Sequence, residues 1–328
     1  MSRGGLATSV RHRPRTSRPR LNVLAVGDAI LDVVTPPLPP GGAGDRQSRV
    51  VALSNLPGGN ATNFALAFAA LGGRARFVGC IGRDWAGAFL REAFRRGKVD
   101  ARLRVSPRAT GMTMAVTFDD STRHLITAAG ANADLRASDV PARWIAGARH
   151  VHRAGYWWAS GLIGTPTARL LARAQRAGVA TSLDIATDPE GWPRPRRDAV
   201  LSALPHVTTF FGNEEEVRML AGLPTLEGAA EEVLSKGAQE VVVHQGAQGS
   251  TIFTRAGVWS AGAFPVVPSN PTGCGDVFNA AYVLASMEGA DWSARLRFAN
   301  AAAACHLEDP RKPYPTRRGV RARFGVSL

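Results

Sequence analysis

The sequence of 328 residues has only three cysteines and no long apolar run. Cys80, Cys274 and Cys305 show neither paired spacing nor a metal-binding pattern, which argues against a disulfide framework. No uninterrupted apolar stretch approaches the roughly 18 residues that a membrane-spanning helix needs. An apolar signal core is also lacking near the N-terminus, so we expect a cytoplasmic protein that does not engage a membrane.

Acidic residues are missing from both ends of the chain. Residues 1–20 carry six arginines, and residues 311–328 carry five arginines and Lys312, so the two ends supply 12 of the 14 excess positive charges. The rest of the chain is nearly neutral and contains no zinc-finger, basic-zipper or aromatic RNA-binding motif. We therefore expect residues 1–20 and 321–328 to form basic tails, and we do not expect nucleic acid as a partner.

Two glycines bracket a small residue and precede an aspartate in the segment 270–281. Gly273, Cys274 and Gly275 are followed by Asp276 and then by a run of small and apolar residues typical of a buried helix. The first turn of a helix presents unpaired N–H groups and a partial positive charge, so these amides suit a phosphoryl group. Asp276 is then placed to accept the proton of an attacking hydroxyl. A tight turn with an N-capping aspartate is the alternative interpretation.

This segment resembles the C-terminal signature of the ribokinase-like (PfkB) family of carbohydrate and nucleoside kinases. The usual form of the signature is Asp-Thr-x-Gly-Ala-Gly-Asp, and this sequence keeps the Gly-x-Gly-Asp core with Asn270 for the leading aspartate and Cys274 for the alanine. The resemblance implies an α/β fold, a three-layer sandwich with a central, mostly parallel sheet and a small β-sheet lid. It also implies ATP as phosphoryl donor and Mg²⁺ as cofactor.

Alternation of strand and helix patterns after Ala133 favours the same fold class. Four short apolar runs have the length of buried strands: 150–155, 179–184, 207–213 and 240–244. Regular β/α alternation predicts a parallel sheet covered by helices, with ligands at the carboxyl ends of the strands. We expect a single kinase domain over residues 21–320.

Two stretches of β-forming residues interrupt the N-terminal half of this domain. A Pro/Gly-rich excursion at about 33–57 and an alternating hairpin at about 102–128 predict the two parts of the lid. The resemblance implies that the lid closes over the substrate and excludes water. An exposed lid edge would also suit pairing in a homodimer.

Several residues match the elements with which the family binds the acceptor. Asp32 follows the first strand in a Gly-x-x-x-x-Asp pattern, and a carboxylate suits a polyol because it accepts two hydrogen bonds. Gly58, Gly59 and Asn63 match a Gly-Gly-x-x-x-Asn element at a helix start. Asn132, in a Gly-Ala-Asn triplet, is a candidate for a substrate contact or for a plain turn residue.

The C-terminal half carries the residues expected to bind the nucleotide. Asn213 and Glu216 match the family's Asn-x-x-Glu motif, which implies that Glu216 acts on Mg²⁺ indirectly, through water. Acids also favour the dipole of a helix N-terminus, which is the alternative for this motif. The stretch 184–189 resembles an Asp-x-Asn-x-Arg element but lacks its arginine. The further nucleotide-binding candidates are His244, Gly246, Gly249 and Asn300.

These motifs predict a carbohydrate kinase, an ATP-dependent phosphotransferase that acts on a hydroxyl of a sugar or sugar acid. Asp276 is the expected base, and the amides of residues 273–275 are the expected anion hole. A nucleoside is the alternative acceptor within the same family, because the aromatic cluster at 156–158 suits stacking on a base. A non-catalytic nucleotide-sensing or nucleic-acid-binding protein is a further alternative from another class.

Overall fold

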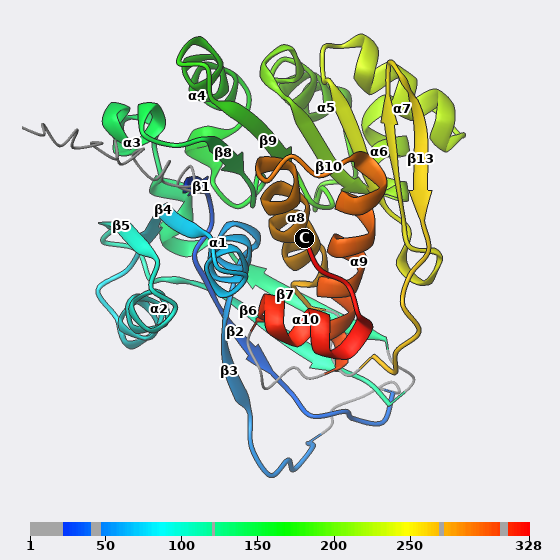
Figure 1. Ribbon diagram of the computed structural model, residues 1–328. Coiled ribbons are helices and arrows are strands. Elements are labelled where there is room, and N and C mark those ends of the chain that lie inside the picture. The colour runs from blue at the N-terminus through cyan, green and yellow to red at the C-terminus, as the bar shows by residue number, and fades with distance from the viewer. Residues whose placement is uncertain (1–21, 41–46, 120–121, 269–271, 309–313) are drawn as a thin grey trace, which may run out of the picture.

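A nine-stranded sheet forms the centre of the molecule (Figure 1). The computed structural model describes residues 22–40, 47–119, 122–268, 272–308 and 314–328, so the tail expected at 1–20 and Asn270 lie outside the described residues. In order across the sheet the strands are β13 (Gly257–Ala261), β12 (Ser250–Thr254), β11 (Glu240–His244), β10 (Thr209–Asn213), β9 (Ala180–Asp184), β8 (His150–Arg153), β1 (Asn22–Val26), β4 (Arg74–Ile81) and β5 (Asp100–Val105). Only β12 runs antiparallel to its neighbours, β11 and β13. The predicted mostly parallel sheet is confirmed.

Helices cover both faces of this sheet, as Figure 1 shows. One face carries α1 (Asn60–Ala70), α2 (Trp85–Arg96), α8 (Cys274–Met287), α9 (Trp292–Glu308) and α10 (Arg317–Phe324). The other face carries α3 (Ala142–Ala146), α4 (Thr165–Arg176), α5 (Arg194–Leu201), α6 (Glu214–Ala221) and α7 (Leu226–Ser235). Central strands such as β11 are apolar throughout their middle because both of their faces are buried in these two cores.

A second sheet of four strands forms the lid. Its order is β3 (Ser54–Gly58), β2 (Ile30–Val34), β6 (Gly111–Thr117) and β7 (Arg123–Ala128). The lid parts expected at 33–57 and 102–128 need correction. Residues 102–105 belong to β5, which pairs with β4 in the main sheet. The apolar run 50–53 is not a strand; β3 begins at Ser54 and includes Pro57, which an edge strand tolerates because one side of it needs no backbone donor.

The C-terminal residues 321–328, expected as a basic tail, are part of the folded domain. Helix α10 packs against α9, and the Val320 and Val326 side chains are buried in the core. Arg317 pairs with Glu288 and Arg323 pairs with Glu308. The sequence analysis predicted a tail here because arginines dominate the segment. The segment instead includes a short amphipathic helix, whose few apolar residues are buried.

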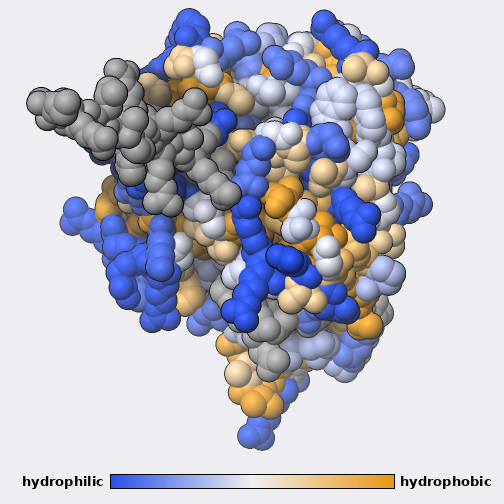
Figure 2. Space-filling model, in the orientation of Figure 1, coloured by the Kyte–Doolittle hydropathy of each residue, from blue (hydrophilic) through white to orange (hydrophobic). Residues whose placement is uncertain are grey.

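Within the described residues we find no helix with the length and apolar character that spanning a membrane requires. The surface of the face in Figure 2 mixes polar and apolar residues, with apolar residues prominent at the lower tip, where the segment leading into β3 lies. Exposed large apolar side chains on and beside the lid are Val51, Leu53, Met114, Leu125 and Ile126.

Candidate active site

Helix α8 begins at the glycine-bracketed motif. Gly273 is its N-cap residue and has φ of 77°, a left-handed conformation that favours glycine. Within the described residues no side chain caps this N-terminus, so the first amides, those of Cys274 and Gly275, are available to an anion. A Cβ at Gly275 would lie 3.4 Å from the His244 ring, so the second glycine lets the helix start pack on that ring. Asp276 is not the N-cap residue, contrary to the alternative interpretation.

Asp276 is buried and held by two side-chain amides of α1. Asn60 Nδ2 donates to Oδ1 at 3.0 Å, and Asn63 Nδ2 donates to Oδ2 at 2.9 Å. Burial raises the pKa of Asp276 well above its usual value and the charge of Asp184 raises it further, while the two amides oppose the shift. A carboxylate with a raised pKa is a stronger base, which suits proton abstraction from a hydroxyl. Asn60 was not among the predicted residues. The only feature of the sequence that could have indicated a role in the site is its position at the start of α1.

Two glycines let α1 and the lid approach buried carboxylates closely. A Cβ at Gly58 would lie 2.2 Å from the Asp32 carboxyl, and one at Gly59 would lie 3.0 Å from that of Asp28. Gly59 is also the N-cap residue of α1, with φ of 93°. Asp28 accepts hydrogen bonds from the first two amides of α1 at 3.1 and 2.9 Å, so it positions the helix that carries Asn63. Asp28 was missed because its role depends on a helix 32 residues away in sequence.

Asp32 lies on β2 of the lid and is 6% exposed. Burial raises its pKa to about 7, the neighbouring Asp28 adds to the shift, and Thr113 opposes it. A Cβ at Gly273 would lie 3.0 Å from Asn63 Nδ2, so the α8 loop meets the same α1 residue that holds Asp276. The structure therefore brings the start of β2, the start of α1 and the start of α8 together, as the motifs predicted.

Asn132 braces the backbone. Its Oδ1 accepts from Ala29 N at 2.8 Å, and its Nδ2 donates to Ala29 O and Ala129 O, both at 3.0 Å. The side chain is fully buried, and both of its polar atoms are used in these bonds. Of the two roles considered for Asn132, the structure favours the turn residue over the substrate contact.

Asn213 and Glu216 form a reciprocal cap at the start of α6. Asn213 Oδ1 accepts from Glu216 N, and Glu216 Oε2 accepts from Asn213 N, both at 2.8 Å. Thr187 Oγ1 donates to Glu216 Oε1 at 2.9 Å, and burial raises the pKa of Glu216. The alternative for this motif, acids that favour the dipole of a helix N-terminus, also agrees with the structure, because Glu216 lies in the first turn of α6. It does not exclude an indirect metal role, because each carboxylate oxygen keeps a lone pair.

A buried chain of polar groups runs behind α8 from β11 to β9. His244 Nε2 donates to Asn279 Oδ1 at 2.9 Å, and Asn279 Nδ2 donates to Asp184 Oδ2 at 2.6 Å. Burial lowers the pKa of His244 to about 4 and raises that of Asp184 to about 7. His244, predicted to contact nucleotide, thus supports α8 from behind. Asn279 was missed because a polar residue inside an apolar helix carries no motif.

The remaining nucleotide candidates lie near the antiparallel edge of the main sheet. Asn300 Nδ2 donates to Ala261 O at 2.9 Å and to Gly262 O at 3.2 Å, so it ties α9 to the end of β13. Gly249 has φ of 100°, and a Cβ there would lie 2.1 Å from Ala261 O. Gly246 has φ of 56° and open space around it. Asn300 and Gly249 therefore shape one loop, and Gly246 leaves room beside it.

Three residues near the starts of α1 and α8 come from segments without a motif. Arg123 of β7 donates from Nη1 to Thr272 Oγ1 at 2.6 Å, so the lid reaches the loop before α8. His306 Nε2 lies 2.9 Å from Thr272 O. Tyr314 donates from its hydroxyl to Asn63 Oδ1 at 2.9 Å. All three were missed because their partners are distant in sequence.

The fit of Mg²⁺ to the site can be judged from its carboxylates. No three His, Cys, Asp or Glu side chains in the part of the chain that the structure describes are arranged to hold a metal. Glu216 raises the pKa of Asp184, and Asp184 raises that of Asp276, so like charges oppose one another across the site. A divalent cation would relieve this repulsion, and Mg²⁺ commonly completes its shell with phosphate oxygens and water. The residues present fit Mg²⁺ held largely by a nucleotide.

Comparison with known sequences identifies the family. The sequence pattern described as "pfkB family carbohydrate kinase" matches residues 20–313. A nucleoside kinase from Methanothermobacter thermautotrophicus is 28% identical over 261 residues, which cover 78% of this chain and 80% of that protein. A ribokinase from Haemophilus influenzae is 28% identical over 276 residues, which cover 80% of this chain and 85% of that protein.

Comparison with solved structures confirms the fold. A candidate ribokinase II from E. coli, solved in complex with ATP and Mg²⁺, matches with a TM-score of 0.79 and 23% identity, covering 92% of this chain and 98% of its own. At this identity the match establishes the ribokinase-like architecture and not the substrate. Because the family pattern spans most of the sequence, the chain belongs to the PfkB family of carbohydrate kinases.

Proposed function

We propose that this kinase transfers the γ-phosphate of ATP to a hydroxyl of a sugar or sugar acid, with Asp276 as the base. The observation that carries the proposal is the position of Asp276. Its carboxyl is buried, is held by two α1 amides and lies in the first turn of a helix whose N-terminus is capped by no side chain of the described residues. A base and an anion-binding helix start are thus adjacent, which is the pairing that phosphoryl transfer needs.

In the proposed reaction Asp276 removes the proton from the acceptor hydroxyl. Asn60 and Asn63 fix the orientation of the carboxylate, and the amides of Cys274 and Gly275 hold the transferred phosphoryl group. Asp32 orients the acceptor by accepting hydrogen bonds from its hydroxyls. Lid closure keeps water from competing for the phosphoryl group.

ATP with Mg²⁺ is the proposed donor. Support comes from the structural neighbour solved with ATP and Mg²⁺ and from the opposing carboxylates of this chain. Asn213, Glu216 and Asp184 would act on the metal through its water and phosphate ligands. When bound, the metal would offset the charge that develops on the phosphates. A cytoplasmic location, where ATP is abundant, belongs to this proposal.

A nucleoside is the second candidate acceptor, and a nucleoside kinase among the relatives favours it. The aromatic cluster at 156–158 does not add support. Tyr156 is fully buried and Trp157 is 6% exposed, and Trp157 packs edge-on against Trp192 with ring centroids 5.9 Å apart. Arg196 lies over the Trp157 ring at 4.3 Å. Tyr156 and Trp157 are thus core residues and Trp158 is half-buried, so the nucleoside proposal rests mainly on the relative.

The test is ADP release from MgATP with a panel of pentoses, hexoses, sugar acids, inositols and nucleosides. We expect one acceptor class to be turned over, and Asp276→Asn to reduce kcat to less than about a tenth while nucleotide affinity is largely kept. Asp198→Asn, a matched change on the exposed face of α5, should behave as wild type. An Asp276→Asn enzyme with more than a tenth of wild-type kcat would remove Asp276 as the base. Nucleotide binding without turnover of any acceptor would favour a non-catalytic role.

The lid suggests a homodimer as part of the proposal. Met114 of β6 and Ile126 of β7 are directly paired across the two strands and are 46% and 54% exposed. Neighbouring exposed apolar side chains of this kind mark interaction surfaces more often than single ones do. Pairing of two lids would bury them and would hold the strands that cover the acceptor.

A further inference from the structure

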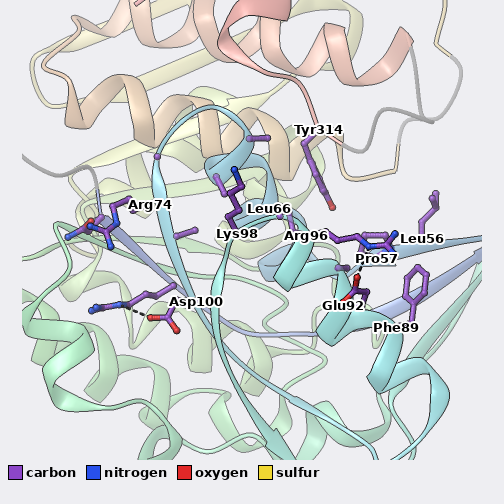
Figure 3. A pocket seen from close by; sticks show the side chains of 18 residues that line it. Leu56, Pro57, Leu66, Arg74, Phe89, Glu92, Arg96, Lys98, Asp100 and Tyr314 are labelled. Atoms are coloured by element: carbon purple, nitrogen blue, oxygen red, sulfur yellow. Dashed lines mark hydrogen bonds and ion pairs between the residues drawn. The ribbon is translucent and has the colours of Figure 1, made fainter.

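A second cavity lies beside the proposed acceptor site, between α1 and α2. It has a volume of about 1000 Å³ and is shown in Figure 3. None of the residues assigned above to catalysis or to acceptor, nucleotide or metal binding lines it. Its apolar wall is formed by Leu56, Leu66, Ala69, Ala70, Phe89 and Ala93. A concave apolar site of this size is large enough for a small organic molecule.

Four cationic side chains line the same cavity, and two of them have no acidic partner among the described residues. Arg76 pairs with Asp100 at 3.4 Å, and Arg96 pairs with Glu92 at 2.7 Å. Arg74 and Lys98 form no ion pair with any carboxylate in the described residues, and both are exposed at the rim. The cavity thus combines an apolar wall with two cations that are free to meet an anion.

Lys98 occupies a backbone position that usually belongs to glycine. It follows Gly97, the C-cap residue of α2, and has φ of 57° in the left-handed region. A helix commonly ends on a glycine in this conformation, because a Cβ is disfavoured there. Replacing Lys98 by glycine therefore removes the charge without introducing backbone strain.

Tyr314 places the cavity next to the acceptor site. It is one of the residues that line the cavity, and Figure 3 shows its side chain directed toward the other labelled residues. Its hydroxyl donates to Asn63 Oδ1 at 2.9 Å, and Asn63 in turn donates to Asp276 at 2.9 Å. A molecule in the cavity would contact the residue that supports Asn63.

We propose that this cavity binds an organic anion with an apolar body, its head group on Arg74 and Lys98 and its body against α1 and α2. A neutral apolar ligand would leave both cations without a counter-charge. Residues 1–20 of the chain itself carry six arginines and no acid, so like charge disfavours them as occupants. The inference does not depend on the proposed kinase substrate.

Fluorescence titration of the full chain with two related probes tests the charge requirement. The first probe is 8-anilinonaphthalene-1-sulfonate, and the second is N-phenyl-1-naphthylamine, which has the same rings without the charge. We expect saturable binding of one sulfonate per chain, weakened by added salt, and weaker binding of the neutral probe. Equal affinity for the two probes would overturn the proposal.

Variants locate the binding. Lys98→Gly combined with Arg74→Gln should weaken sulfonate binding about fivefold, the sum expected for two exposed charge contacts. Ala69→Phe, which fills the cavity, should abolish it, and Arg91→Gln on the exposed face of α2 should not change it. Tyr314→Phe keeps the ring and should bind as wild type. Unchanged binding in the double variant, or in the filled variant, would place the probe elsewhere and refute the site.

Discussion

Four carboxyl groups are buried around the proposed acceptor and phosphoryl sites: Asp28, Asp32, Asp184 and Asp276. Burial raises the pKa of each of them. Removing a carboxylate from water is costly unless it is fully paired, so these groups reduce the stability of the ligand-free protein. Groups of this kind concentrate at functional sites, where the same burial makes a carboxylate a stronger base or acceptor.

Asp32 offers a test of the loss of stability that a buried carboxylate causes. Its pKa is raised from 3.8 to about 7, so the folded protein binds this proton more tightly than the unfolded chain does. The associated stability is present below pH 4 and is lost as the pH rises through 7. We expect Asp32→Asn to be more stable than wild type by roughly 2–4 kcal/mol at pH 8, with a smaller gain at pH 5. Urea unfolding at both pH values measures this; equal stability at pH 8 would contradict it. The acceptor KM should rise in the same variant.

Arg123 is a cation that the lid brings to the loop before α8, beside the proposed anion hole. The stretch 184–189 lacks the arginine that the family resemblance implies there, and Arg123 reaches Thr272 from the lid. We expect Arg123→Ala to lower kcat about tenfold or more with little change in nucleotide affinity, because a charge near the transferred phosphoryl group stabilises the transition state. Arg123→Lys should recover part of the loss.

His124→Ala is the matched control for this experiment, because the neighbouring side chain on β7 points to the other face of the lid. Steady-state kinetics separates the effects on kcat and KM. A kcat that stays at the wild-type level in Arg123→Ala would show that the contact with Thr272 serves only to close the lid.

At the scale of elements, three helices begin around the site, and their N-terminal amides differ in whether and how a side chain caps them. The first amides of α1 are capped by Asp28, and α6 is closed by its reciprocal cap of Asn213 and Glu216. Helix α8 has no side-chain cap from the residues that the structure describes. The helix dipole and the free amides of α8 are therefore available to a phosphoryl group, whereas those of α1 serve to hold the helix that carries Asn63.

Helix α10 was not predicted from the sequence, and its contribution to stability can be measured. Val320 is fully buried against the core that α8 and α9 share. We expect Val320→Asp to lower the free energy of unfolding by about 3 kcal/mol or more, because it buries an unpaired carboxylate. Arg318→Ala, at an exposed position of the same helix, should cost less than about 0.5 kcal/mol. Similar unfolding midpoints for the two variants would mean that α10 does not contribute to the fold in solution.

At the scale of the molecule, the lid leaves apolar side chains in water. If two lids pair, Ile126→Glu should convert a dimer into a monomer, because two carboxylates would then be buried against each other. Light scattering coupled to size-exclusion chromatography reports the mass directly. Leu223→Glu, at an apolar position that is 40% exposed in the segment following α6, should leave the mass unchanged. A wild-type protein that elutes as a monomer at all concentrations would refute the pairing.

The sequence by itself determined the family, the sheet class and the glycine positions where the backbone has a positive φ before a helix. Gly59 and Gly273 could be identified from the sequence as residues that precede helices. Both have a positive φ, which favours glycine, and this constraint is local. The Asn-x-x-Glu motif of Asn213 and Glu216 is also local, because its two residues lie within one helical turn. Alternation of apolar runs and helices predicted the parallel sheet, because each strand buried on both faces is apolar throughout.

Only the tertiary structure decided which polar side chains face the site. Asn132 and Asn300 both occur in motif-like surroundings, but their amides bond to backbone. Arg123 has no motif, yet it reaches a residue 149 positions away, and Tyr314 reaches Asn63 across 251 positions. A side-chain amide or guanidinium looks the same in sequence whether it bonds to ligand, backbone or a distant loop. Its partner is set by packing between elements far apart in the chain, which leaves no periodic trace in the sequence.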